Sequence, residues 1–182
     1  MIIVVCGPGG VGKGTVVARL VAEDPRLWLS RSWTTRVQRP GEPDDAYTYV
    51  DRDAFEARIA ADGFLEHAEF LGNLYGTPWP EAGDERDIVL EIDVQGAEQV
   101  IRRVPPDQRL FILLEPPSPE VQAERLRGRG DPPEQAEERI RVAQGEIDRA
   151  RELDAIRIVN DDLDRTVAEV QHLIEAARAD RA

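Results

Sequence analysis

Short runs of apolar residues alternate along this chain with longer segments in which apolar positions recur every three or four residues. Four runs are predicted to be β-strands, because they are short and rich in β-branched residues: 2–6, 88–94, 109–114 and 155–160. Runs without polar alternation are typical of strands buried on both faces. The helical spacing predicts helices at 13–24, 118–130, 134–153 and 162–179, with another ending near residue 103. Strands alternating with helices indicate an α/β fold, with a parallel sheet covered on both faces.

A polar section with several glycines and prolines, from about residue 31 to 83, interrupts this alternation. It contains a short strand pattern at 47–50 and a helix pattern that starts after Asp51, a residue type suited to capping a helix. At 182 residues the chain has the length of one domain. We therefore expect a single domain, 1–182, in which this section is an insertion.

The glycine-rich loop after the first strand has the pattern G-x-x-x-x-G-K, formed by Gly7, Gly12 and Lys13. Glycines let backbone N–H groups turn inward around phosphate oxygens, and the N-terminus of the next helix adds partial positive charge. Lys13 is the only lysine among 23 lysine and arginine residues. A compact ammonium on a thin stem fits inside such a loop, whereas the wider fork of arginine does not. The pattern therefore predicts a phosphate-binding site.

Composition narrows the classes of partner. The net charge of −13 argues against a nucleic-acid polymer, which needs a basic face. Arginines nevertheless gather at 31–39 and 125–141, and such local clusters suit a small polyanion. No apolar run approaches the ~20 residues of a membrane helix, so we expect no membrane partner. The single cysteine, Cys6, and the absence of a signal-peptide pattern predict a cytoplasmic protein.

Five further blocks make the pattern specific: SRSWTTRVQRPGEPDDAYTYV, GFLEHAEFLGNLYGTPW, LEIDVQGAEQV, ERLRGRG and VNDDLDRTV. Together with the glycine loop they resemble guanylate kinase, in the order of that family and over nearly the whole chain. The resemblance implies a P-loop NTPase fold with a parallel sheet core flanked by helices. It also implies a mixed α/β GMP-binding insertion at about 34–83, a mobile lid at about 126–139, and transfer of the γ-phosphoryl group of ATP to GMP or dGMP with Mg²⁺.

The resemblance assigns a site for the acceptor nucleotide. Its phosphate would be held by hydroxyl and guanidinium groups: Ser32, Arg36, Arg39, Tyr47 and Tyr75. Arginines present paired donors that match phosphate oxygens. The guanine would be read by Glu66, Thr77 and Asp93. A carboxylate accepts from both the N1–H and the 2-amino group of guanine, whereas adenine offers a lone pair at N1 and no 2-amino group.

ATP would be held by the glycine loop together with Arg125 and Asn160. The loop residues are Gly7, Gly9, Gly10, Val11, Gly12, Lys13, Gly14 and Thr15. The catalytic residues that the resemblance implies are Lys13, Arg36, Arg129 and Arg139. Between the last two, the chain is one residue shorter than the common spacing of the family.

The expected contacts to Mg²⁺ are Thr15 and Glu91, directly or through water. Many glycine loops have a hydroxyl directly after the lysine, where this chain has Gly14, and the family usually has Asp in place of Glu91. Glu91 and Asp93 alternate along the predicted strand 88–94, so both should point to one face at its carboxyl end. Open α/β sheets bind their ligands at that edge.

Two alternatives share the loop or the fold. A non-catalytic guanylate-kinase-like module would bind another protein, but such modules commonly lack the glycine loop or the lid arginines. A P-loop kinase for another acceptor, such as a sugar phosphate, would not need Glu66, Thr77 and Asp93. We therefore expect ATP and GMP or dGMP as partners, and the sequence predicts no oligomeric state.

Overall fold

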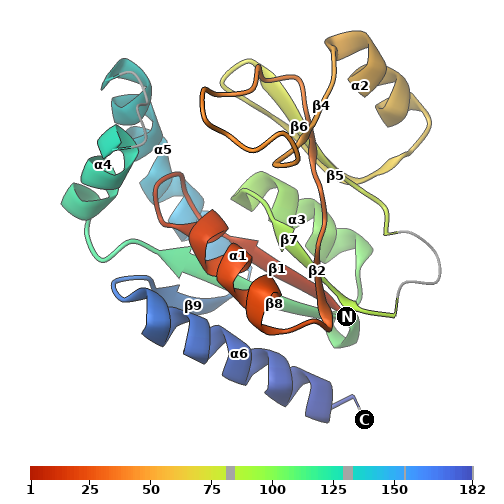
Figure 1. Cartoon of the computed structure of the whole chain (residues 1–182), viewed down its shortest axis with the longest axis vertical. Coiled ribbons are helices and arrows are strands. Elements are labelled where there is room, and N and C mark those ends of the chain that lie inside the picture. Colours follow the sequence, from red (N-terminus) through yellow and green to blue (C-terminus); the bar gives the residue numbers. More distant parts are fainter. Residues whose placement is uncertain (81–84, 129–132, 154, 182) are drawn as a thin grey trace.

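A five-stranded parallel sheet forms the core of the computed structural model, which describes residues 1–80, 85–128, 133–153 and 155–181, and of 133–136, 138 and 139 only the backbone. The strand order is β2-β7-β1-β8-β9 (Figure 1). These strands are β1 Ile2–Cys6, β2 Leu27–Leu29, β7 Asp87–Glu91, β8 Arg109–Glu115 and β9 Ile156–Val159. The helices are α1 Lys13–Glu23, α2 Arg52–Ala60, α3 Val94–Arg103, α4 Pro119–Gly128, α5 Pro133–Glu152 and α6 Leu163–Ala179, with a short 3-10 helix at Pro106–Gln108.

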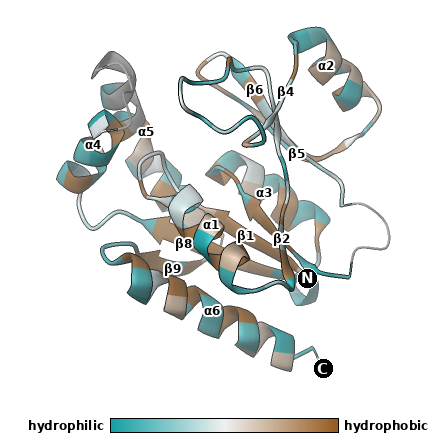
Figure 2. Cartoon of the chain, in the orientation of Figure 1, coloured by the Kyte–Doolittle hydropathy of each residue, from teal (hydrophilic) through white to brown (hydrophobic). Residues whose placement is uncertain are grey.

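Side-chain alternation along β1 explains why a strand without polar residues lies at the centre of the sheet. Ile3 and Val5 pack with residues of α1 and α6, whereas Val4 and Cys6 pack with residues of α3 and α5. All four side chains are fully buried. Figure 2 shows the sheet as mostly hydrophobic ribbon between these helices. The predicted parallel sheet with both faces covered is confirmed.

A second sheet, in the order β4-β3-β6-β5, packs on α3 through β5. Its strands are β3 Trp33–Thr34, β4 Thr48–Tyr49, β5 Phe64–Phe70 and β6 Asn73–Pro78. The sheet and α2 share a small core of their own, in which the rings of Phe55 and Phe64 stack with centroids 4.6 Å apart and Leu74 lies beside them. In Figure 1 this part of the molecule lies to one side of the core sheet.

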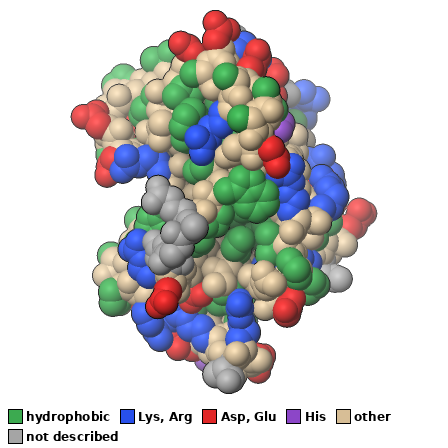
Figure 3. All heavy atoms as spheres, turned by 90° about the vertical axis from the view of Figure 1, so that its right-hand side faces the viewer, with side chains coloured by type: hydrophobic (Ala, Val, Ile, Leu, Met, Phe, Trp, Pro, Cys, Tyr) green, Lys and Arg blue, Asp and Glu red, His purple; other side chains and the backbone are tan. Residues whose placement is uncertain are grey.

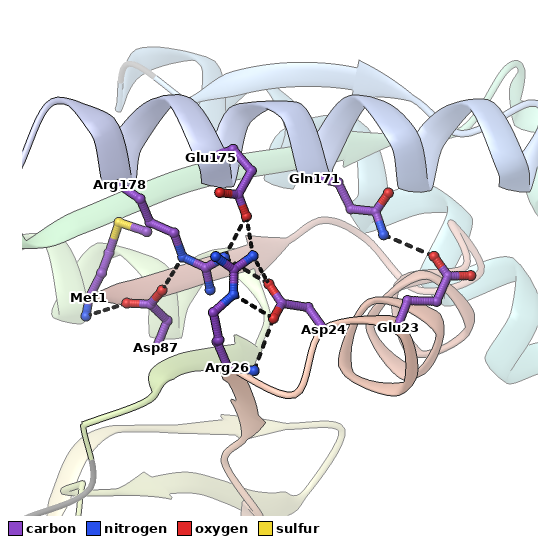
Figure 4. Close-up of polar contacts among 8 residues, drawn as sticks. All are labelled: Met1, Glu23, Asp24, Arg26, Asp87, Gln171, Glu175 and Arg178. Carbon is purple, nitrogen blue, oxygen red and sulfur yellow. Dashed lines mark hydrogen bonds and ion pairs between the residues drawn. The ribbon is translucent and has the colours of Figure 1, made fainter.

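A polar network ties α6 to the amino ends of the core strands (Figure 4). The guanidinium of Arg178 donates to Asp87 and Asp24, at 2.7 Å in each case, and to Glu175 at 2.6 Å. Asp87 begins β7 and also accepts from the Met1 ammonium at 2.8 Å. The network therefore fixes the end of the sheet that lies opposite the carboxyl ends of its strands.

Several details differ from the sequence prediction. The strands β3, β5 and β6 of the second sheet were not predicted. Nor was β2, because a strand of three residues shortly after Pro25 gives no clear pattern. The strand β7 ends at Glu91, three residues earlier than predicted, and Asp93 is instead the N-cap of α3. Its carboxylate accepts the backbone N–H of Gly96 at 2.8 Å, which starts the helix at that point.

The face of the molecule in Figure 3 carries lysine and arginine side chains in separate groups, between acidic and hydrophobic side chains. The described residues on this face form no continuous basic strip. Among the helices of the described ranges, none combines the length and the apolar character that crossing a membrane requires.

Candidate active site

A cavity of about 730 Å³ lies between the glycine loop and the second sheet. Most of the predicted site residues line it: Gly7, Gly9, Lys13, Gly14, Ser32, Arg36, Arg39, Tyr47, Glu66, Tyr75, Glu91 and Asp93. The loop after β1 and the end of β7 both reach this cavity, so it lies at the carboxyl edge of the parallel sheet. Such an edge is where open α/β sheets bind ligands.

The glycine loop wraps around the ammonium of Lys13. Nζ donates to the main-chain oxygens of Gly7 at 2.6 Å and Pro8 at 3.2 Å. Gly12 has a φ of 92°, and a Cβ there would lie 2.6 Å from Nδ2 of Asn160, so only glycine fits. The ammonium therefore lies within the loop and at the cavity wall, where it can reach a phosphate.

Side chains behind the loop hold its carbonyl groups. Nδ2 of Asn160 donates to the main-chain oxygen of Val11 at 2.7 Å, and Nη1 of Arg125 donates to the same oxygen at 3.2 Å. Nε2 of Gln122, which is buried on α4, donates to the oxygen of Gly9 at 2.7 Å. Arg125 and Asn160 thus brace the loop and do not line the cavity. Gln122 was not predicted, because one glutamine on a charged helix leaves no pattern in the sequence.

A mostly buried ion pair orients Arg36 at the other end of the cavity. Its Nη2 donates to both carboxylate oxygens of Glu42, at 2.8 and 3.0 Å, and the backbone N–H of Arg39 donates to Oε2 at 3.0 Å. Burial opposes both charges, but the hydrogen bonds prevail: they raise the pKa of Arg36 and lower the pKa of Glu42 to about 2. Glu42 was not predicted as a site residue, although it lies only three positions after Arg39.

Two tyrosines complete this end of the cavity. The rings of Tyr47 and Tyr75 meet edge to face, with centroids 6.2 Å apart, and the guanidinium carbon of Arg36 lies 5.4 Å from the Tyr47 centroid. Burial, with a further contribution from the charge of Glu91, raises the pKa of Tyr47 to about 12. The Tyr47 hydroxyl therefore stays protonated at neutral pH and can donate a hydrogen bond to an anion.

A buried carboxylate lies at the junction of the second sheet and α3. A bulge in β5 places Glu66 opposite Thr77 of β6, and the Thr77 hydroxyl donates to Oε1 of Glu66 at 2.5 Å. Glu66 is 4% exposed. Burial raises its pKa to about 7, against the effect of the Thr77 hydrogen bond and with a further contribution from the charge of Asp93. At this end the cavity thus presents two carboxylates, Glu66 and Asp93, which suit a ligand that carries hydrogen-bond donors.

Few side chains near the glycine loop could supply oxygen ligands to a magnesium ion. Both carboxylate oxygens of Glu91 lie 3.4 Å from the position that a Cβ on Gly14 would take, so Glu91 faces the loop. Thr15 is exposed and is not among the cavity-lining residues. Within the described ranges, no group of three or more His, Cys, Asp or Glu side chains could hold a metal alone. Magnesium in nucleotide sites usually takes one or two carboxylates, water and substrate phosphates, so a single carboxylate beside the loop fits.

The remaining predicted residues lie elsewhere. Gly10, Val11 and Gly12 do not line the cavity, and Thr77 is fully buried behind Glu66. Arg129 lies outside the described residues, as do residues 130–132 of the expected lid and the side chain of Arg139 on α5. A buried carboxylate that was not predicted, that of Glu146 on α5, also lines the cavity.

The strand β1 leads through the glycine loop into α1 at the carboxyl edge of a parallel sheet. This arrangement is the motif that defines P-loop nucleotide-binding proteins. The cavity extends from that loop to Arg36 and Glu66, which leaves space for a second ligand beside the first. The fold and the cavity together define the class as P-loop kinases of small phosphate-bearing molecules.

Comparison with known proteins identifies the family within this class. The family model described as guanylate kinase matches residues 1–177. Guanylate kinase of Synechococcus sp. (strain CC9311) is 45% identical over 175 residues, covering 92% of this chain and 90% of that protein. A guanylate kinase of Thermus thermophilus is 47% identical over 183 residues, covering 96% of this chain and 80% of that protein. The crystal structure of guanylate kinase from Anaplasma phagocytophilum matches with a TM-score of 0.76 at 29% identity, covering 97% of this chain and 85% of that one. The chain belongs to the guanylate kinase family, the ATP:GMP phosphotransferases.

Proposed function

We propose that this chain transfers the γ-phosphoryl group of ATP to GMP or dGMP, in one in-line step that needs Mg²⁺. The observation that carries the proposal is that one cavity contains the glycine loop, the paired guanidinium of Arg36 and two carboxylates, Glu66 and Asp93. An acceptor without N–H donors would leave the buried carboxylate of Glu66 with the Thr77 hydroxyl but without the donors that a guanine supplies. GMP suits Arg36 through its phosphate and the two carboxylates through its base, and the glycine loop remains for the phosphates of ATP.

ATP is held by the loop from Gly7 to Thr15, with Arg125 and Asn160 beside it. The loop's backbone N–H groups and the ammonium of Lys13 bind the phosphates, and the N-terminus of α1 adds partial positive charge. The two bracing side chains hold the oxygen of Val11 from behind, which keeps the loop in shape before ATP arrives. Binding then costs little reorganisation.

GMP is held at the opposite end of the cavity. Its phosphate is bound by Ser32, Arg36, Arg39, Tyr47 and Tyr75. Glu42 holds Nη2 of Arg36 through both carboxylate oxygens, and Nη1 donates to the main-chain oxygen of Val37 at 2.8 Å, so the plane of the guanidinium is fixed before the phosphate arrives. Glu66, supported by Thr77, accepts from N1–H and the 2-amino group of guanine, and Asp93 lies at the same end. The base of dGMP is identical, so both nucleotides are acceptors.

In this site catalysis consists of positioning the two nucleotides and neutralising the charge of their phosphates. Thr15 and Glu91 would hold magnesium, directly or through water, and the ion would supply positive charge next to the nucleotide phosphates. Lys13 and Arg36 fix the donor and acceptor phosphates in line. The lid at about 126–139 closes and brings Arg129 and Arg139 to the transferring group, which also excludes water. No side chain forms a covalent intermediate.

The proposed partners are ATP and GMP or dGMP, without a nucleic-acid polymer or a membrane. The net charge of −13 and a cavity of about 730 Å³ support a nucleotide over a polymer. We also propose a cytoplasmic location, since the only cysteine, Cys6, is a fully buried free thiol that suits a reducing compartment.

The test is ADP release from ATP and Mg²⁺ with a panel of acceptors: GMP, dGMP, AMP, UMP and a sugar phosphate. Rapid ADP release with GMP and dGMP alone supports the proposal, and it should stop when EDTA removes the metal. The Lys13→Met variant is the matched background, because it should keep the fold while it lacks the ammonium. Preferred use of a sugar phosphate would identify a different P-loop kinase, and no ADP release with any acceptor would indicate a non-catalytic module.

A further inference from the structure

Gly96, in the first turn of α3, lies between the two carboxylates of the guanine site. Its backbone N–H donates to Oδ1 of Asp93 at 2.8 Å. On its other side, a Cβ built on Gly96 would lie 2.5 Å from Oε2 of Glu66 and 2.9 Å from its carboxyl carbon. We infer that Gly96 is the positioning residue that sets guanine specificity in this chain, an inference that rests on the proposed function.

The missing Cβ is what gives Glu66 its place. Real Cβ atoms essentially never approach another heavy atom within 3.0 Å, so the carboxylate occupies space that any other residue type would fill. The carboxylate has little freedom to move aside, because Glu66 is 4% exposed and its other oxygen accepts from Thr77 at 2.5 Å. A larger residue at position 96 must therefore displace the carboxylate.

The strand that carries Glu66 is also fastened to α3, so it cannot retreat as a whole. Gln99 makes two hydrogen bonds to the backbone of His67: its Nε2 donates to the oxygen at 2.6 Å, and its Oε1 accepts the N–H at 3.2 Å. One turn later, Nη1 of Arg103 donates to the oxygens of Phe64, at 2.8 Å, and Leu65, at 3.2 Å. The backbone is thus held on both sides of Glu66, and only its side chain can respond.

The helix itself gives no other reason for glycine at this position. Gly96 does not have a positive φ, and alanine is a better helix former than glycine. Without Glu66 nearby, alanine would be the favoured residue. The specificity role therefore predicts a penalty that depends on Glu66, whereas an ordinary helix position predicts a gain.

The experiment compares Gly96→Ala with wild type on GMP and on inosine 5′-monophosphate, which keeps N1–H but lacks the 2-amino group. A displaced carboxylate loses both guanine contacts but only one hypoxanthine contact. We expect kcat/KM for GMP to fall about 10- to 100-fold. The ratio of kcat/KM for GMP to kcat/KM for inosine 5′-monophosphate should fall about tenfold, and the KM for ATP should not change. A merely structural defect would lower kcat/KM for both acceptors by the same factor. An unchanged ratio in the folded variant therefore overturns the inference.

The matched control is Gly145→Ala on α5, where a Cβ would meet nothing within 4 Å. This variant should keep both activities and both KM values. The proposed function fails separately: wild type would then not use GMP at all, whatever the variants do.

A double-mutant cycle keeps the inference testable even if Gly96→Ala is too unstable to assay. The melting temperature is compared for Gly96→Ala in the wild-type and in the Glu66→Ala background. We expect alanine at position 96 to lower it in the first background and to leave it unchanged or raise it in the second. Equal losses in both backgrounds would show that Glu66 is not what requires the glycine, and the inference would be wrong.

Discussion

Glu66→Gln is the substitution that isolates guanine reading, because it preserves the size of the side chain and removes its charge and one acceptor. In the structure one carboxylate oxygen accepts from the Thr77 hydroxyl at 2.5 Å, within a site where Glu66 is 4% exposed. A carboxylate can serve Thr77 and two guanine donors at once, since each oxygen has two lone pairs. An amide must turn its NH₂ toward Thr77 or toward one of the guanine donors.

The expected loss follows from those contacts. One charge-assisted hydrogen bond to guanine disappears, and one donor is left facing another donor in a buried site. Together these effects cost about 2–4 kcal/mol, which corresponds to a fall of about 30- to 1000-fold in kcat/KM for GMP. The KM for ATP should stay within about twofold, because the glycine loop is not altered.

The pH profile adds a second signature, because burial raises the pKa of Glu66 to about 7. A protonated carboxyl cannot accept from both guanine groups, so kcat/KM for GMP should fall about tenfold per pH unit below 7 and level off above about 8. The Glu66→Gln variant should lack this slope. Folding stability changes in the opposite direction: a raised carboxyl pKa adds stability at low pH, and this contribution is lost as the pH rises through about 7.

The assay is steady-state ADP release, measured from about pH 8.5 down to about pH 5.5 so that the range spans both sides of the Glu66 pKa. Glu69→Gln is the matched control, since Glu69 is an exposed residue on the same strand. A Glu66→Gln variant that folds, uses GMP as well as wild type does and retains the slope would refute guanine reading by this residue.

Three further changes test other parts of the site. Lys13→Arg keeps the charge but should lose most of kcat, because the loop encloses a point charge with oxygens at 2.6 and 3.2 Å; near-normal turnover would contradict the steric account. Glu42→Gln should raise the KM for GMP about tenfold and leave that for ATP unchanged, because Arg36 loses a charged partner; kinetics with equal KM values would show that the ion pair does not orient the arginine. Arg129→Ala or Arg139→Ala should lower kcat about 10²- to 10⁴-fold while calorimetry without ATP shows little change in GMP affinity, whereas weak GMP binding with normal saturated turnover would place these arginines at the acceptor phosphate.

The core of this fold is readable from the sequence because its signals are local. The apolar run of β1 has no polar alternation, which requires cover on both faces, and Ile3 and Val4 indeed face opposite helix layers. The glycine loop is equally local, since Gly7, Gly12 and Lys13 lie within seven positions. By contrast, β2 has three residues at the edge of the sheet and no pattern long enough to recognise.

The parts that were missed depend either on contacts between distant segments or on local contacts that the sequence pattern left ambiguous. Gln122 reaches Gly9 across 113 positions, and no feature near either residue indicates that contact. Asp93 was assigned to a strand because alternation with Glu91 fitted one, but a short acidic side chain followed by a helix also fits an N-cap, and the bond to Gly96 decides between the two. Glu42 lies only three positions after Arg39, so the sequence could have suggested it as a carboxylate partner for the nearby arginines. In the structure it accepts from the Arg36 side chain and the Arg39 backbone.

The transfer itself can be followed with ATP labelled at the γ-phosphate. The chain is incubated with labelled ATP, Mg²⁺ and unlabelled GMP, and the nucleotides are separated at early times. The account predicts that the label appears in the β-phosphate of GDP in step with ADP formation, and that AMP in place of GMP gives at most about a hundredth of that rate. Label that stays in ATP, or that appears in inorganic phosphate or in the product from AMP at a comparable rate, would contradict a GMP-specific phosphotransferase.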